Sequence, residues 1–164
     1  MGRLRNEASW HDFTERGRFH NHDTKGRTLY GAEVMVRPSE QGRGVGKKLY
    51  TARRALVKKL GLLRVRAGAR IRGYHLQADR LTPAQYVLQV EAGMLSDPTL
   101  SFQLKQDFVP LAVAPDYLHH DPQSLGHAAV IEWLNPEMAT EQDTRCATPA
   151  SHRSRIRPRR SGRD

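Results

Sequence analysis

A glycine-rich loop between an apolar segment and a long helical pattern constrains the fold of this chain more than any other feature. Residues 29–36 are apolar and β-branched enough for a strand, and Pro38 ends that strand because proline cannot donate a hydrogen bond to a neighbouring strand. The loop at 39–46 carries three glycines and continues directly into the helical pattern at 47–60. A second apolar segment follows at 62–66. Strand, glycine loop, helix and strand together predict a β-α-β unit, and with it an α/β fold.

The helical pattern is amphipathic. Its apolar side chains recur at intervals of three and four residues and form one stripe, made of Leu49, Ala52, Leu56 and Leu60. Gly61 stands where the residue just past a helix end is expected, and Lys58 and Lys59 complement the negative end of the helix dipole. We therefore expect the helix to end at residue 60.

The start of this helix is suited to a phosphate group. The first N–H groups of a helix have no partner within it, and the helix dipole adds positive potential there. Gly42, Gly44 and Gly46 leave room for a pyrophosphate, and alternating glycines allow consecutive amides to converge on one anion. Arg43, Lys47 and Lys48 would add positive charge at the rim. The loop therefore predicts phosphate binding.

The spacing of the glycines excludes two common phosphate-binding motifs. A Walker A motif is absent because Gly46 follows Gly42 too closely and Lys48 precedes a leucine. A dinucleotide-binding fingerprint is absent because Lys47 stands where the third glycine is required. A P-loop nucleotidase is therefore excluded, and dinucleotide binding is disfavoured.

The residues from Gln41 to Gly46 fit a different pattern, [QR]-x-x-G-x-[GA], and follow a strand that ends in Val34-Met35-Val36-Arg37-Pro38. Joined to the long helix, this segment resembles the acetyl-CoA signature of the GNAT N-acetyltransferase superfamily. Residues 96–108 resemble the second helix of that family, and residues 109–113 and 128–134 resemble its two final strands. The resemblance implies a mixed, mostly antiparallel sheet with flanking helices.

Three shorter segments resemble one subgroup more narrowly. They are Gly73-Tyr74-His75, Asp97-Pro98 and residues 131–136. They are similar to the GNAT module that precedes a carbon–nitrogen hydrolase domain in bifunctional proteins. Residues 81–93 would form a helix inserted in that subgroup, with Pro83 in its first turn.

The resemblance implies an enzyme that transfers an acetyl group from acetyl-CoA to an amine acceptor by direct attack in a ternary complex. The backbone of the strand end would pair with the pantetheine arm, and the loop amides would hold the pyrophosphate. The implied cofactor-binding residues are Val34, Met35, Val36, Gln41, Gly42, Arg43, Gly44, Val45, Gly46 and Lys47. A general base must take a proton from the amine, and the candidates are Glu33, Tyr74 and His75, of which we prefer Glu33.

Three departures from the family pattern concern activity. The family places a strand, two helices and two further strands before the motif strand, whereas 28 polar, irregular residues precede Leu29. We therefore expect an N-terminally shortened domain whose motif strand has an open edge, through which two copies could pair. Gln103 stands where many members have a tyrosine that protonates the departing thiolate, and Asp107 replaces a glycine at a helix end.

The resemblance covers residues 29–136, and it therefore implies three parts: an irregular segment at 1–28, the GNAT-like domain at 29–136, and an Arg-rich tail at 137–164. The tail lacks periodicity and predicts disorder. It holds seven of the arginines against four acidic residues, which accounts for +3 of the net charge of +10. A stretch of about 18 apolar residues is missing, which disfavours a membrane span or signal peptide and favours a cytoplasmic location.

Two alternatives to an active acetyltransferase remain open. One is a CoA-binding remnant without activity, and the other is a basic nucleic-acid-associated protein. Arg64, Arg66, Arg70 and Arg72 alternate along a predicted strand and could meet the CoA 3′-phosphate, nucleic acid or water. Aromatic residues are not interleaved with these arginines, so nucleic-acid binding is disfavoured. The single cysteine, Cys146, and the short histidine clusters predict no metal site.

Overall fold

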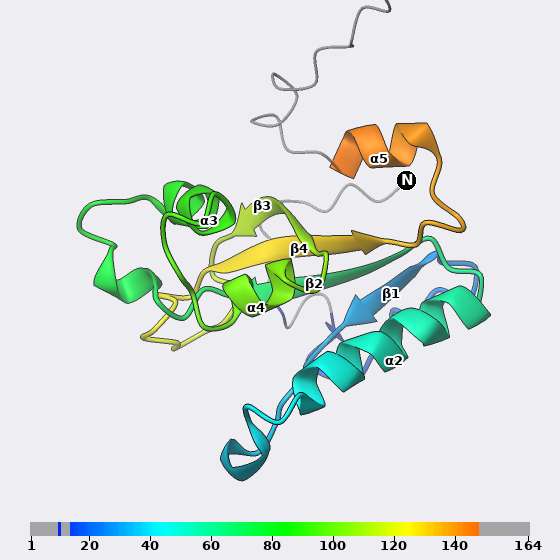
Figure 1. The fold of residues 1–164 in the computed structure, drawn as a ribbon, viewed down its shortest axis with the longest axis horizontal. Helices are drawn as coiled ribbons and strands as arrows, with labels where there is room; N and C mark the ends of the chain where they lie inside the picture. The colour runs from blue at the N-terminus through cyan, green and yellow to red at the C-terminus, as the bar shows by residue number, and fades with distance from the viewer. Residues whose placement is uncertain (1–9, 11–13, 148–164) are drawn as a thin grey trace, which may run out of the picture.

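The computed structural model describes residue 10 and residues 14–147 (Figure 1). These residues form one four-stranded sheet with the strand order β1-β2-β4-β3. The strands are β1 (Thr28–Gly31), β2 (Arg64–Arg70), β3 (Val109–Ala114) and β4 (Ala128–Leu134). β1 pairs with β2 in parallel, while β2 with β4 and β3 with β4 are antiparallel. The mixed, mostly antiparallel sheet confirms the predicted fold class.

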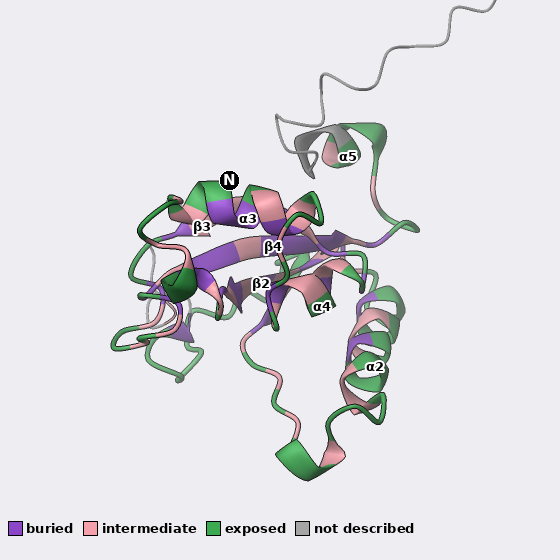
Figure 2. Cartoon of the chain, turned by 60° about the vertical axis from the view of Figure 1, so that its left-hand side comes forward, coloured by how far each residue is buried: buried purple, intermediate pink, exposed green. Residues whose placement is uncertain are grey.

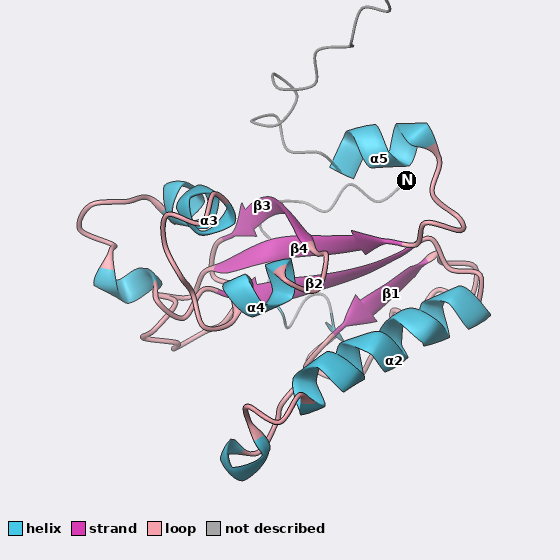
Figure 3. Cartoon of the chain, in the orientation of Figure 1, coloured by secondary structure: helices cyan, strands magenta, loops and turns pink. Residues whose placement is uncertain are grey.

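The helices are α2 (Val45–Lys59), α3 (Pro83–Glu91), α4 (Leu100–Leu104) and α5 (Glu141–Ala147), and two short 3-10 turns are η1 (Pro38–Glu40) and η2 (Tyr74–Leu76) (Figure 3). A β1-α2-β2 crossover, the connection that parallel neighbours require, joins the first two strands. Among the described helices, none is long and apolar enough to cross a membrane.

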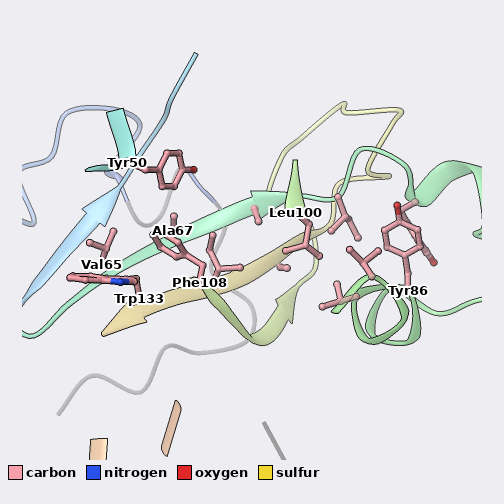
Figure 4. Packing of buried hydrophobic residues seen from close by; sticks show 14 of the residues in the cluster. Tyr50, Val65, Ala67, Tyr86, Leu100, Phe108 and Trp133 are labelled. Atoms are coloured by element: carbon pink, nitrogen blue, oxygen red, sulfur yellow. The ribbon is translucent and has the colours of Figure 1, made fainter. Parts of the chain in front are cut away.

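One core joins α2, α3 and α4 to a single face of the sheet. Along β2 the side chains alternate, and Val65, Ala67 and Ala69 are buried on this face. Tyr50 and Val57 of α2, Tyr86, Val87 and Val90 of α3, and Leu100 of α4 belong to the same buried cluster (Figure 4). The three helices therefore cover one face, and the arginines of β2 point to the other.

The arginines on that opposite face are bound by carboxylates. The buried Glu132 carboxylate accepts hydrogen bonds from Arg66 at 2.5 Å and from Arg64 at 3.0 Å. Arg70 and Asp121 form a two-bond ion pair at 2.5 and 2.6 Å. This guanidinium lowers the pKa of Asp121 from 3.8 to about 2. The CoA 3′-phosphate, nucleic acid or water were the expected partners of these arginines. Carboxylates of the chain itself bind Arg64, Arg66 and Arg70, so none of the three is needed to neutralise them.

Two predicted boundaries differ from the structure. The first strand ends at Gly31 rather than Val36, since its pairing with β2 stops at the partners Gly31 and Ala67. The helix begins at Val45, two residues earlier than the pattern indicated, because Gly44 already provides the carbonyl for the first helical hydrogen bond.

The apolar stripe of α2 lies outside rather than inside. Leu49, Leu56 and Leu60 are 43, 44 and 57% exposed, whereas Tyr50 and Val57 face the sheet. The physical reason is aromatic packing, because the Tyr50 ring is held edge-on by two phenylalanines of the α4 region at centroid distances of 5.5 and 5.6 Å. This contact rotates the helix away from the orientation that its leucines favour.

The segments at the two ends are described in part. Residues 15–27 consist of turns and irregular backbone, and residues 1–9 and 11–13 lie outside the described part of the chain. Within the tail expected to be disordered, residues 141–147 form α5, whose start is capped by reciprocal hydrogen bonds between Thr140 and Asp143. Residues 148–164 of the predicted tail lie outside the described residues.

Candidate functional site

The candidate site begins where β1 and β2 part. After Gly31 the chain leaves the sheet and runs out to η1, while β2 continues to Arg70 alongside β4 (Figure 2). Two side chains hold the departing backbone. The Trp10 indole donates to the carbonyl of Ala32 at 3.3 Å, and Arg53 of α2 donates to the carbonyl of Glu33 at 2.8 Å. These donors take the place of a neighbouring strand.

In the segment that leaves β1, residues 32–36, partly buried and exposed side chains alternate as in a strand, although the segment has no partner strand. Val34 packs against the core, whereas the side chains of Glu33 and Met35 are exposed. The backbone N–H and C=O groups of Val34 and Met35 have no hydrogen-bond partner among the described residues. The carbonyl of Val36 accepts from the Gln41 side chain at 3.0 Å, which closes the loop. An extended ligand with amide groups could therefore pair with residues 34 and 35.

The glycine loop follows at residues 41–44. Gly42 and Gly44 have φ angles of +74° and +77°, a left-handed conformation that glycine adopts at little cost. A Cβ atom at either position would meet nothing within 4 Å, so the loop is open on that side. Gly46, in the first turn of α2, has the Phe102 ring at 3.2 Å from the position of a Cβ. Any larger residue there must displace this ring.

Backbone donors are concentrated at this loop. The N–H of Gln41 already donates to Pro38 at 3.3 Å, and the first helical bond runs from the N–H of Lys48 to Gly44 at 3.1 Å. Between them, the N–H groups of residues 42–47 have no acceptor among the described residues. Arg43 is paired with Glu40 at 2.7 Å, whereas Lys47 is exposed and has no ion pair in the described part of the chain. The arrangement suits an anion.

The structure separates the candidate catalytic residues. Glu33 lies on the segment that leaves β1. Tyr74 and His75 lie in η2, after β2. Tyr74 is buried and donates to the carbonyl of Leu81 at 3.1 Å. The Nδ1 atom of His75 lies 3.0 Å from the carbonyl of Gln123. The described polar contacts of these two side chains do not include the glycine loop.

A buried carboxylate explains why Gly73 and Asp97 occur together. Asp97 is fully buried and accepts hydrogen bonds from the N–H of Gly73 at 2.8 Å, the hydroxyl of Tyr86 at 2.9 Å, and the N–H groups of Thr99 and Leu100. Burial and the neighbouring carboxylate raise the pKa of Tyr86. This group of residues, which we call the Asp97 clamp, fixes the loop after β2 against α3 and α4.

Sequence reasoning did not select Tyr50 as a functional residue. It is 6% exposed, and the amide nitrogen of Gln103 on α4 donates to its hydroxyl at 2.9 Å. Tyr50 and Val57 are both apolar-bodied residues seven positions apart, a spacing that marks one face of a helix. The spacing of this pair could have indicated the buried face of the helix, but the leucine stripe contains more residues and was chosen instead. Among the described residues, no group of three metal-ligating side chains occurs.

Two solved structures place this architecture among GNAT-like domains. The GphF GNAT-like decarboxylase, solved in complex with isobutyryl-CoA, superposes with a TM-score of 0.65 at 22% identity, over 78% of this chain and 64% of that one. The loading GNATL domain of CurA from Lyngbya majuscula superposes with a TM-score of 0.58 at 22% identity, over 67% of this chain and 55% of that one. The protein therefore has a GNAT-like fold.

Two proteins from Bacillus subtilis (strain 168) are similar to this chain in sequence. The chain is 38% identical over 137 residues to a probable hydrolase, YhcX, and 35% identical over 129 residues to an uncharacterized N-acetyltransferase, YkwB. These alignments cover 84% and 79% of the chain, but only 27% and 57% of the respective relatives. The predicted resemblance to the GNAT superfamily, and to a GNAT module joined to a hydrolase, is confirmed. No protein-family model matches the chain.

Proposed function

We propose that this chain binds acetyl-CoA and transfers the acetyl group to an amine by direct attack. The observation that carries the proposal is the run of unpartnered N–H groups at residues 42–47, beside a strand end whose backbone is also unpaired. The first group would bind the pyrophosphate and the second would pair with the pantetheine amides. The proposal is supported by an N-acetyltransferase among the relatives and by a fold neighbour bound to an acyl-CoA.

The transfer requires that the attacking amine loses a proton and that the departing thiolate gains one. The amine nitrogen forms a bond to the thioester carbon, the bond from carbon to sulfur breaks, and CoA leaves as a thiolate. The attacking amine loses one proton, and Glu33 is the proposed general base. Its side chain is exposed, and it precedes Val34, one of the residues proposed to pair with the pantetheine arm. Tyr74 and His75 are secondary candidates, since their side chains are engaged with Leu81 and Gln123.

Binding is tested by thermal stability. A ligand at about a hundred times its dissociation constant stabilises the folded state by about 2.7 kcal/mol, so millimolar acetyl-CoA should raise Tm by several degrees. Gly44→Glu should abolish this rise, because its carboxylate would occupy and repel the anion site. Gly93→Glu is the matched control, since Gly93 has a similar φ (+74°, against +77° at Gly44) and equally open surroundings, but lies after α3.

Gly46→Glu should also abolish the rise in Tm. A wild-type protein that shows no rise with acetyl-CoA, at protein and ligand concentrations where a micromolar complex would saturate, contradicts the proposal. An equal loss of the rise in Gly93→Glu would show that the effect comes from general destabilisation rather than from the loop.

Activity is tested by release of the CoA thiol. Release that depends on both the protein and an added amine, after subtraction of the spontaneous reaction of that amine with acetyl-CoA, separates an enzyme from a CoA-binding remnant. Glu33→Gln should lower this rate by about a factor of 100, the size of effect expected when a general base is removed. An unchanged rate would exclude Glu33 as the base.

Two further parts of the proposal concern the oligomeric state and the location of the protein in the cell. β1 pairs only with β2, so its outer edge is free among the described strands, and we propose that two copies pair through it. A monomer in a sedimentation experiment would contradict this pairing. A cytoplasmic location stays a prediction from composition.

A further inference from the structure

A glycine in the middle of β2 marks the point where β1 and β2 part. The two strands pair as far as Gly31 and Ala67, and Gly68 is the next residue of β2. We call these three residues the strand fork. A Cβ atom on Gly68 would overlap the ring of Tyr117, which comes from the loop between β3 and β4. Glycine weakens a strand and commonly marks the close approach of another group. At Gly68 that group is the Tyr117 ring.

Two hydrogen bonds hold Tyr117 against the strand fork. Its hydroxyl is bonded to the hydroxyl of Tyr30 on β1, and its carbonyl accepts from the N–H of Trp10 at 3.0 Å. Tyr117 is 3% exposed. Burial raises the pKa of Tyr30 and that of Tyr117, so both hydroxyls keep their protons at neutral pH. The two phenols therefore form an uncharged wall on the face of the sheet opposite the helices.

The helix side of the strand fork is also filled. A Cβ atom on Gly31 would lie 3.0 Å from the Arg53 guanidinium and 3.2 Å from the Cβ atom of Ala67. Ala67 belongs to the buried core (Figure 4). Arg53 is fixed by its hydrogen bond to the carbonyl of Glu33 at 2.8 Å. A group that enters the fork would therefore meet Arg53 and the core on one face and Tyr117 on the other.

The proposed path of the pantetheine arm leads to this fork. The carbonyl of Val36 accepts from the Gln41 side chain, and the amides proposed to bind the pyrophosphate follow directly. Between phosphorus and sulfur, CoA has about as many bonds as four residues of extended backbone, each of which advances about 3.3 Å. Counted back from Val36, the sulfur would lie beside Ala32, the residue that follows the last pair of β1 with β2. The acyl group would then extend into the fork.

We infer that Tyr117 sets the largest acyl group that the site accepts, and that the Tyr30 hydroxyl holds its ring in place. This inference rests on the proposed function. The methyl group of an acetyl thioester would contact the Tyr117 ring, whereas a branched acyl chain would need the space that this ring occupies. A closely packed interior does not yield such space without cost. Tyr117 would therefore determine specificity through packing, and it makes or breaks no bond.

The experiment is calorimetric titration with acetyl-CoA and with isobutyryl-CoA. Wild-type protein should bind acetyl-CoA at least about tenfold more tightly, because a pocket of fixed size discriminates by about tenfold or more for each carbon that it cannot hold. Tyr117→Ala removes the ring, so this variant should bind isobutyryl-CoA at least as tightly as acetyl-CoA. Tyr117→Leu keeps an apolar side chain in the same place, and should lower the preference for acetyl-CoA by about threefold or more.

Tyr86→Ala is the matched control. Tyr86 also lies against a glycine, since a Cβ atom on Gly73 would overlap its hydroxyl, and Tyr86 is 2% exposed. It belongs to the Asp97 clamp rather than to the strand fork. Tyr86→Ala should therefore lower Tm, as Tyr117→Ala does, but should keep the wild-type preference for acetyl-CoA.

The outcomes separate this inference from the proposed function. Wild-type protein that binds isobutyryl-CoA as tightly as acetyl-CoA would overturn the inference, whether or not the variants fold. An unchanged preference in Tyr117→Ala would also overturn it, and Tyr117→Leu decides if the alanine variant does not fold. An equal loss of preference in Tyr86→Ala would show general loosening instead of a local wall. In each of these cases acetyl-CoA still binds. Wild-type protein that binds neither acyl-CoA would overturn the proposed function itself.

Discussion

β1 and β2 run side by side in parallel, but the loops that follow them use their backbone donors in opposite ways. After β1, the N–H groups of residues 42–47 have no acceptor among the described residues. After β2, the N–H groups of Gly73, Tyr74 and His75 bind Asp97, Ile71 and Gln123. Adjacent carboxyl ends of parallel strands thus form one loop whose donors are satisfied within the chain and one whose donors are open to a ligand.

The comparison shows how a fold holds an unsatisfied site. The Asp97 clamp and the Arg70 ion pair satisfy polar groups at the end of β2, whereas the donors of the neighbouring loop have no acceptor among the described residues. We propose that stability and ligand binding belong to different strand ends.

Gly73→Ala should destabilise the protein most. The added methyl group would overlap the Tyr86 hydroxyl, which donates to the Asp97 carboxylate. Overpacking of this kind, with loss of clamp hydrogen bonds, should lower the free energy of unfolding by about 3 kcal/mol. Urea denaturation measures the change. A loss below that of Gly42→Ala would show that the clamp is not rigid.

The Arg70–Asp121 pair should make stability depend on pH. The folded-state pKa of Asp121 is about 2, below the ordinary 3.8, so its contribution is present at pH 5 and is lost as the pH falls from about 4 through 2. The contribution should be about 1 to 2 kcal/mol, reduced because Arg70 is 38% exposed. Asp121→Asn should flatten the unfolding free energy over this range. An unaltered pH profile would contradict the assignment.

Gly42→Ala should have a moderate effect on stability and a larger one on binding. The methyl group meets nothing within 4 Å, so only the left-handed backbone conformation is strained, at about 1 kcal/mol. The measurement is urea denaturation with and without acetyl-CoA. The rise in stability with acetyl-CoA should shrink, since the methyl group stands on the side from which the pyrophosphate would approach.

Asp107→Gly should slightly stabilise the protein. Asp107 has a φ of +63°, and Arg54 supports it through bonds to its carboxylate at 3.3 Å and to the carbonyl of Gln106 at 3.0 Å. Glycine removes the backbone strain, while the Asp107 side chain is 81% exposed and its ion pair contributes little. We expect a gain of about 0.5 kcal/mol in the unfolding free energy. A loss would mean that the ion pair outweighs the strain.

Local patterns were sufficient for the β-α-β unit and the glycine loop. Apolar segments predicted the first two strands, and glycine spacing predicted the open turn before α2, because both depend on residues close together in sequence. The end of β1 was not predictable in the same way. Its residues 32–36 still alternate, and pairing stops only because Trp10 and Arg53, distant in sequence, hold the carbonyls of Ala32 and Glu33.

By itself the sequence determined that an open glycine turn lies before an amphipathic helix, since glycine spacing is a local property of the backbone. Only the tertiary structure decided which face of that helix is buried. Tyr50, rather than Leu49, faces the core because the rings of Phe102 and Phe108 reach it from about 50 residues away in the chain. The same packing brings Gln103 to the Tyr50 hydroxyl, and periodicity within one helix contains no information about that contact.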